Sequence, residues 1–171
     1  TWSVATADLA TALTADVRFA GALTVTGIAN GNEAAALTAY TSATTGATSV
    51  TLTASDTVWS VSAADLTTAL AAGVRFAGTL TVTDIAAGDE TAALTAFTAT
   101  TTGATSVTLT AADSTWSVAG SALTTALADG VFFAGALTVT GIANGSEAAA
   151  LTAYTDTLTG ATSVTLTASD A

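Results

Sequence analysis

The sequence contains no cysteine, proline, methionine, histidine or lysine. Without cysteine, the chain uses no disulfide bonds. Serine and threonine are abundant, but a nucleophilic hydroxyl needs a general base, and the residues that usually serve as one are missing. No apolar stretch approaches the roughly 18 to 20 residues that cross a membrane. These absences predict a protein that is not an enzyme and does not insert into a membrane.

Positive charge is also scarce. Two arginines stand against 13 acidic residues, which gives a formal net charge of -11. Because phosphate backbones would be repelled, we expect no nucleic-acid partner. An acidic, lysine-free surface without disulfides is compatible with secreted bacterial proteins. The composition therefore predicts a location outside the cell or on its surface.

What the sequence contains is a repeat. Tryptophan recurs every 57 residues, at Trp2, Trp59 and Trp116. The chain is three copies of one unit, residues 1–57, 58–114 and 115–171, and the first and third match at 44 of 57 positions. Alanine and threonine supply 84 of the 171 residues. Since no linker separates the copies, we expect each to pack directly on the next.

Two segments of each copy alternate apolar residues with threonine, the period-two pattern of a half-buried strand. They are Leu23–Thr26, Val50–Thr53, Leu80–Thr83, Val107–Thr110, Leu137–Thr140 and Val164–Thr167. Two further extended pieces are predicted in each copy, at Trp2–Val4 and Val17–Phe19 in the first. The sequence leaves open whether these pieces lengthen the strands or form a second sheet.

Helical spacing separates the strands. Glu33, Ala36, Leu37 and Tyr40 fall at i, i+3, i+4 and i+7, and the other copies keep this pattern from Glu90 and Glu147. The preceding residues are expected N-caps, namely Asn32, Asp89 and Ser146. A left-handed C-cap is expected at Gly46, Gly103 and Gly160.

A second helix in each copy is predicted by leucine and alanine at helical spacing, beginning at Leu9, Leu66 and Leu123. Residues that tolerate positive φ follow it, namely Asp16, Gly73 and Gly130. Strands joined by crossovers of about a dozen residues or more are parallel, with right-handed connections. The predicted fold is an α/β solenoid with two strand-helix coils per repeat. An all-β parallel solenoid is the alternative, but alanine and leucine favour helix.

The segments "GALTVTGIANG" and "ATSVTLTASD", with little positive charge and no cysteine, are similar to the Thr/Ala-rich tandem repeats of very large bacterial secreted and cell-surface proteins, including repeat-array adhesins. The resemblance implies a spacer, fibre or adhesive role outside the cell. It carries over no catalytic residues.

The threonines of the predicted strands form a second candidate feature. If the six strands stack, their threonines align in two columns about 4.8 Å apart between strands, which resembles the ice-binding faces of some β-solenoids. The high strand propensity of threonine and its suitability for a solvated or sheet-contacting face explain the same residues, and the sequence favours this interpretation. The possible ice- or carbohydrate-binding face comprises Thr24, Thr26, Thr51, Thr53, Thr81, Thr83, Thr108, Thr110, Thr138, Thr140, Thr165 and Thr167. A row of exposed tryptophans would favour such binding, whereas buried tryptophans would favour a structural role.

The carboxylates are predicted to be structural. Glu33 and its equivalents begin helices, where the helix dipole favours negative charge. Asp56, Asp113 and Asp170 are expected in turns after strands. Asn30, Asn32 and Glu33 could offer oxygen ligands to calcium, but the second copy has Ala87 in place of Asn30, so we expect no metal and no cofactor.

Neither end copy has the polar, atypical sequence that closes a solenoid core against water. Leu23 in the first copy and Leu166 in the last keep the internal pattern. We therefore expect the ends to meet further copies, in a longer chain or in a neighbouring subunit stacked head to tail. Such a contact gives an open filament unless its rotation closes a ring.

Overall fold

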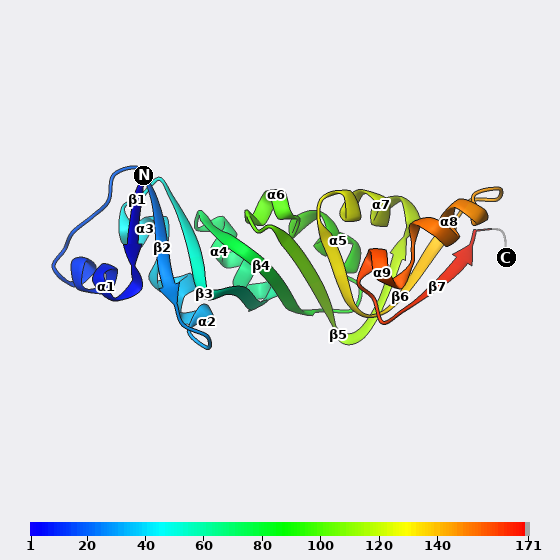
Figure 1. Ribbon diagram of the computed structural model, residues 1–171, viewed down its shortest axis with the longest axis horizontal. Coiled ribbons are helices and arrows are strands. Elements are labelled where there is room, and N and C mark those ends of the chain that lie inside the picture. Colours follow the sequence, from blue (N-terminus) through cyan, green and yellow to red (C-terminus); the bar gives the residue numbers. More distant parts are fainter. Residues whose placement is uncertain (170–171) are drawn as a thin grey trace. The chain divides into compact units, whose positions relative to one another are not determined.

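The computed structural model describes residues 1–169, in which strands alternate with helices along the chain (Figure 1). The seven strands of this part of the chain form one parallel sheet in chain order. They are β1 (Trp2–Ala5), β2 (Ala22–Ile28), β3 (Ser49–Ser62), β4 (Val74–Ile85), β5 (Ser106–Ala119), β6 (Val131–Ile142) and β7 (Ser163–Ala168).

Each connection between strands contains one helix or two. Those with one contain α1 (Thr6–Thr14), α4 (Ala63–Ala71) and α7 (Gly120–Ala128). Those with two contain α2 (Glu33–Ala39) and α3 (Ser42–Thr45), α5 (Glu90–Ala96) and α6 (Ala99–Thr102), and α8 (Glu147–Ala153) and α9 (Asp156–Thr159). The predicted α/β repeat of strand-helix coils is confirmed, and the all-β alternative is wrong.

Side chains alternate across each strand as predicted. In β2, Leu23 and Val25 are buried, whereas Thr24 and Thr26 between them are half-buried. The buried side packs against helices, since α1 contacts β2 and α2 contacts β3. Leu9 of α1 and its equivalents in α4 and α7 are fully buried. Each coil thus has one helix-covered side that forms the core and one side that carries the threonines.

The extended pieces that the sequence left unassigned lengthen the strands and form no second sheet. β3 is a 14-residue strand that joins the threonine segment of the first repeat to Trp59–Val61 of the second. β4 and β6 begin with the pieces at Val74 and Val131. The first copy differs, because Val17–Ala20 has no strand pairing.

A bend interrupts the long strands where two repeats join. Thr57 in β3 has φ 63°, and Gly78 in β4 has φ 102°. A Cβ at Gly78 would collide with the carbonyl oxygen of Thr57, so the two strands approach closely only because this position is glycine. Ser114 and Gly135 repeat this arrangement in β5 and β6, where the strand register shifts between Thr110 and Thr115.

The predicted N-caps are at the expected positions but make no capping hydrogen bonds. The side chains of Asn32, Asp89 and Ser146 bond no helix amide, because their backbone (φ -104 to -95°, ψ near 0°) is not extended. The predicted capping interaction is therefore wrong for these helices. Ser62 caps α4 instead, where its Oγ accepts a hydrogen bond from the Asp65 amide at 3.2 Å.

The predicted C-caps are confirmed at two positions, and the third, Gly103, has a positive φ of 80°. Gly46 and Gly160 adopt the left-handed conformation, each at φ 76°. They end separate short helices, because α2 stops at Ala39 and Thr41 then caps α3. The predicted positive φ after α1, α4 and α7 is confirmed for all three residues, Asp16, Gly73 and Gly130.

The chain divides into two compact units, Thr1–Thr81 with Thr101–Thr105, and Val82–Thr100 with Ser106–Ala171. The first unit contains two edge-to-face aromatic pairs, Trp2–Phe19 and Trp59–Phe76, whose ring centroids are 5.8 and 5.2 Å apart. Trp116 and Phe133 form the equivalent pair in the second unit, at 5.2 Å. Among the described helices, none is long and apolar enough to cross a membrane.

Candidate functional site: the threonine face and the end faces

The threonine face comprises the twelve strand threonines that the sequence singled out. All twelve lie in strands β2 to β7, and none is buried. Those of β7 are exposed, and the others are half-buried. This is the exposure expected of the uncovered side of a sheet, so the residue types alone do not distinguish a binding face from a solvated one.

Strand register determines how these threonines align. In the first unit, Ser3, Thr24 and Thr51 lie opposite one another on three neighbouring strands. In the second unit, Ser117, Thr138 and Thr165 form the equivalent row. Each row therefore contains two threonines beside one serine. The second threonine of β2 lies where the regular register breaks, between Val25 and Ile28.

The continuous six-strand grid expected from the sequence is not formed. On β6, the neighbours of Thr108 and Thr110 are Phe132 and Ala134, not threonines. The reason is that β5 pairs along its first half with the start of β6, and its second half pairs with the threonine segment of β6. The threonine rows of successive repeats are thus displaced along the strands, and the bend at Ser114 lies between them.

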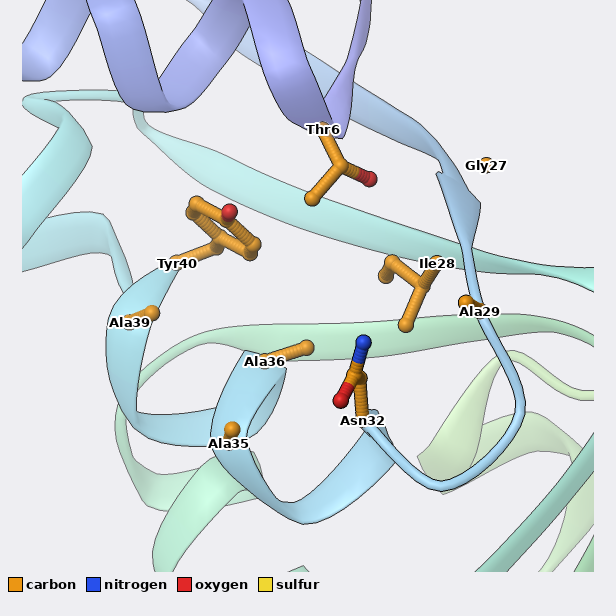
Figure 2. A pocket seen from close by; sticks show the side chains of 9 residues that line it. All are labelled: Thr6, Gly27, Ile28, Ala29, Asn32, Ala35, Ala36, Ala39 and Tyr40. Atoms are coloured by element: carbon orange, nitrogen blue, oxygen red, sulfur yellow. The ribbon is translucent and has the colours of Figure 1, made fainter.

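A small hollow lies between the end of β2 and helix α2, with a volume of about 240 Å³. Figure 2 shows the Tyr40 ring and the Ile28 side chain on opposite sides of the hollow, with Thr6 and Asn32 at its rim. Glycine and alanine provide most of the remaining lining. The polar groups that could orient a ligand are therefore few.

The third repeat contains the equivalent hollow, of about 220 Å³. There the Tyr154 hydroxyl lies 2.8 Å from the Gly120 carbonyl and 2.7 Å from Thr124 Oγ1, so neighbouring groups already satisfy it. At the corresponding positions, the second repeat has Phe97 for tyrosine and Asp84 for glycine. The lining chemistry therefore changes from repeat to repeat, which does not favour a ligand site repeated along the array.

The three glutamates lie at the starts of helices. Glu33, Glu90 and Glu147 begin α2, α5 and α8 as predicted, and Glu90 Oε2 accepts a hydrogen bond of 2.7 Å from the Gly88 amide. Within residues 1–169, no three acidic residues gather in a way that could hold a metal ion. The expectations that the chain has no metal, no cofactor and no catalytic residue stay predictions.

Asp56 and Asp113 stabilise the bends of the long strands. Asp56 Oδ1 accepts a hydrogen bond from the Val58 amide, and Asp113 Oδ1 accepts one from the Thr115 amide, each at 3.1 Å. The Val58 amide and then the Asn30 side chain hold the pKa of Asp56 below its ordinary value. The Thr115 backbone amide, followed by its side chain, lowers the pKa of Asp113. Both are turn residues as predicted, but the turn lies inside a strand; Asp170 lies outside the described residues.

The N-terminal end face exposes side chains that other copies bury. The exposed fraction of Trp2 is 54%, whereas that of Trp59 is 0%. Val17 is 46% exposed, and its equivalent Val74 is 0% exposed. We define the N-terminal end face as Trp2 with Ala15–Ala20. At the two apolar positions, Trp2 and Val17, the interior copies have the same residue types, so residue type does not account for the difference in exposure.

The C-terminal end face shows the complementary exposure. Leu151 of α8 is 67% exposed, whereas its equivalent Leu94 in α5 is 2% exposed. Val164 and Leu166 of β7 are half-buried, although the corresponding residues of β3 and β5 are fully buried. We define the C-terminal end face as Leu151, Asp156 and Val164–Thr167.

The interior repeats show what covers such residues. In the first unit, α2 of repeat 1 packs against α4 of repeat 2, and in the second unit α5 of repeat 2 packs against α7 of repeat 3. Residues 107–110 at the end of repeat 2 also pair with residues 131–134 of repeat 3. At their apolar positions, the end faces therefore expose residue types that the interior junctions bury.

The sequence predicted open ends, and the structure shows which residues of the end copies are exposed. Leu23 is buried within its own repeat, because β1 and β3 flank it on both sides. Trp2 and Val17 are the exposed apolar residues there. Both residues recur every 57 residues, so the sequence marks them as repeated positions. Only strand order shows that these positions face the preceding copy. At the other end, Leu166 of β7 is half-buried and lies on the C-terminal end face.

No protein-family model, curated protein or solved structure matches the chain.

Proposed function

We propose that this chain is a structural or adhesive tandem-repeat segment that acts outside the cell and stacks head to tail with further copies of its own repeat. One observation carries the proposal: the apolar residues of the two end faces are exposed, although the same residue types at equivalent interior positions are buried. Leu151 and Leu94 illustrate it most directly, at 67% and 2% exposure. The two faces differ, so their contact does not close on itself, and an open array is the expected product.

The interior tryptophans support a structural role. Trp59 and Trp116 are buried, and each donates its ring N–H to a backbone carbonyl of its own repeat at 3.3 Å. They do not form the row of exposed aromatic rings that carbohydrate binding would favour. The absence of histidine, lysine and cysteine from the whole sequence supports a role without catalysis. The extracellular location rests on composition and on the resemblance to bacterial surface repeats.

A chain with a fourth repeat tests the stacking proposal. A second copy of residues 58–114, fused after residue 171, should cover Leu151 and extend the sheet. In a repeat array, each added interface contributes to stability, so the midpoint and the steepness of urea unfolding should both rise in a single transition. A fourth repeat that unfolds separately, with no gain for the first three, would contradict stacking.

The alternative function is ligand binding by the threonine face. Its support is the alignment of Thr24 with Thr51, both half-buried, and of half-buried Thr138 with exposed Thr165. The support is weaker than the sequence suggested, because each row is only two threonines wide. Freezing-point depression by the protein, abolished by Thr24→Lys together with Thr138→Lys, would establish this function instead.

A further inference from the structure

The two interior junctions define a register that the end faces can repeat. Between repeats 2 and 3, Val107 pairs with Val131 and Leu109 with Phe133. The Val107 amide donates to the Gly130 carbonyl at 2.9 Å, and the Ala99 amide donates to the Asp129 carbonyl at 3.2 Å. Between repeats 1 and 2, the equivalent bonds run from Val50 to Gly73 and from Ser42 to Ala72, at 3.3 and 3.4 Å.

The contact between two copies of the chain is predicted by replacing each residue of the interior junction with its equivalent in the last or the first repeat, at the ends of the chain. Val164 and Leu166 of one copy would pair with Val17 and Phe19 of the next. The same replacement would direct the Val164 amide at the Asp16 carbonyl, and the Asp156 amide at the Ala15 carbonyl. Val17–Ala20, which is not a strand in this chain, would then become one, as its equivalents already are in β4 and β6.

One position of this junction differs between the interior and the ends. The interior repeats have Gly73 and Gly130, whereas the N-terminal end face has Asp16, which keeps the same positive φ. A Cβ at Gly73 would lie 2.8 Å from Ser42 Oγ of the preceding repeat. A side chain at this position therefore points directly at the neighbouring repeat.

The residue that Asp16 would meet is also acidic. Asp156 of the preceding copy occupies the position of Ser42 and Ala99. Its Oδ1 accepts a hydrogen bond of 2.7 Å from the Thr157 amide, which holds the carboxylate at the start of α9. Asp16 forms an ion pair with Arg18 at 2.9 Å, so the charge on its side of the contact is partly offset. Asp8 on α1 and Glu147 on α8 add further negative charge to the two elements that would pack together.

We infer that Asp16 and Asp156 weaken the contact between two copies of this chain, so that each end face selects a repeat that lacks the opposing carboxylate. The N-terminal end face would favour a preceding repeat with serine or alanine in place of Asp156. The C-terminal end face would favour a following repeat with glycine in place of Asp16. This inference rests on the proposed head-to-tail stacking and adds a repulsive element to it, the usual route by which an interface excludes a wrong partner.

Sedimentation velocity over a range of protein concentrations tests the inference. Asp16→Gly should strengthen self-association at least about tenfold over the unmodified chain, and Asp156→Ser should act in the same direction. Asp16→Asn, which keeps the side chain and removes its charge, should give a smaller gain. Added salt should strengthen association of the unmodified chain and have less effect on the Asp16→Gly variant.

Asp84→Gly is the matched control. Asp84 has φ 59° and is exposed, but it lies on neither end face, so its replacement should leave association unchanged. Equal association of the unmodified chain and the Asp16→Gly variant, or none for either, would overturn the inference. The chain with a fourth repeat tests stacking separately from this inference. Its added junction places Asp156 opposite the glycine equivalent to Gly73, so no two carboxylates face each other there.

Discussion

One residue with positive φ lies at the bend of each long strand, and the paired strands use residues of different kinds, Thr57 in β3 and Gly78 in β4. Thr57 is β-branched, which makes this conformation unfavourable, and its carbonyl then occupies the space where a side chain of residue 78 would lie. Glycine at position 78 is recognisable from the sequence as a special position. Threonine at position 57 is not, which is why the bend could not be predicted.

Gly78→Ala should destabilise the protein strongly, by about 3 kcal/mol, because the new methyl group meets backbone that cannot move aside. Gly88→Ala is the matched control. Gly88 has a similar φ of 95° but open space around it, so only the strain of about 1–2 kcal/mol should remain. Urea unfolding of the two variants measures the difference, and equal losses would mean that the close approach to Thr57 is unimportant.

Asp56 and Asp113 should make the protein sensitive to acid. Their pKa values are lowered in the folded state by the Val58 and Thr115 amides, so the stability that they contribute is present above the ordinary pKa of 3.8. It is lost as pH falls through the lower folded values. The double variant Asp56→Asn, Asp113→Asn should therefore lose less stability than the unmodified protein below about pH 4. Superimposable profiles of unfolding temperature against pH would contradict this.

At the scale of the element, strands and helices follow from side-chain periodicity. The alternation in Leu23–Thr26 and the spacing of Glu33 and Leu37 predicted the elements that contain them. Two features did not follow. Whether Asn32 caps its helix depends on backbone angles that sequence does not reveal. Whether two extended pieces join into one strand depends on which neighbouring strands they pair with. The same pairing determines how many threonines align in each row.

Helix capping offers a comparison at this scale. Ser62→Ala removes a hydrogen bond to the Asp65 amide and should cost about 1 kcal/mol of unfolding free energy. Asp89→Ala should cost only a few tenths, since the Asp89 side chain caps nothing. Chemical denaturation of both variants decides the point. A larger loss for Asp89→Ala would show that this side chain has a partner or a ligand.

At the scale of the whole molecule, repetition connects fold to function. Because the copies are nearly identical, the interior junctions show how one repeat covers the next. The sequence predicted open ends from the period alone. It could not identify Asp16 and Asp156 as opposed residues, because they lie far apart in the chain and only the interior pairing aligns their equivalents, Gly73 and Ser42.

Alternate amides of a parallel strand point to its two neighbours. The Val17 and Phe19 amides are bonded within repeat 1, to Ala12 and Thr45, at 2.9 Å each. The Arg18 and Ala20 amides therefore point toward the side where a preceding repeat would lie. These two amides report directly on whether a repeat covers the N-terminal end face.

Hydrogen exchange at Arg18 and Ala20 is the most direct test of the central claim that the end faces are repeat-binding surfaces. In this chain, both amides should exchange rapidly. With a further copy of residues 58–114 fused before Thr1, they should become as protected as the equivalent amides of Phe132 and Ala134. If they still exchange rapidly while the added repeat is folded, the N-terminal end face does not receive a preceding repeat, and the claim is wrong.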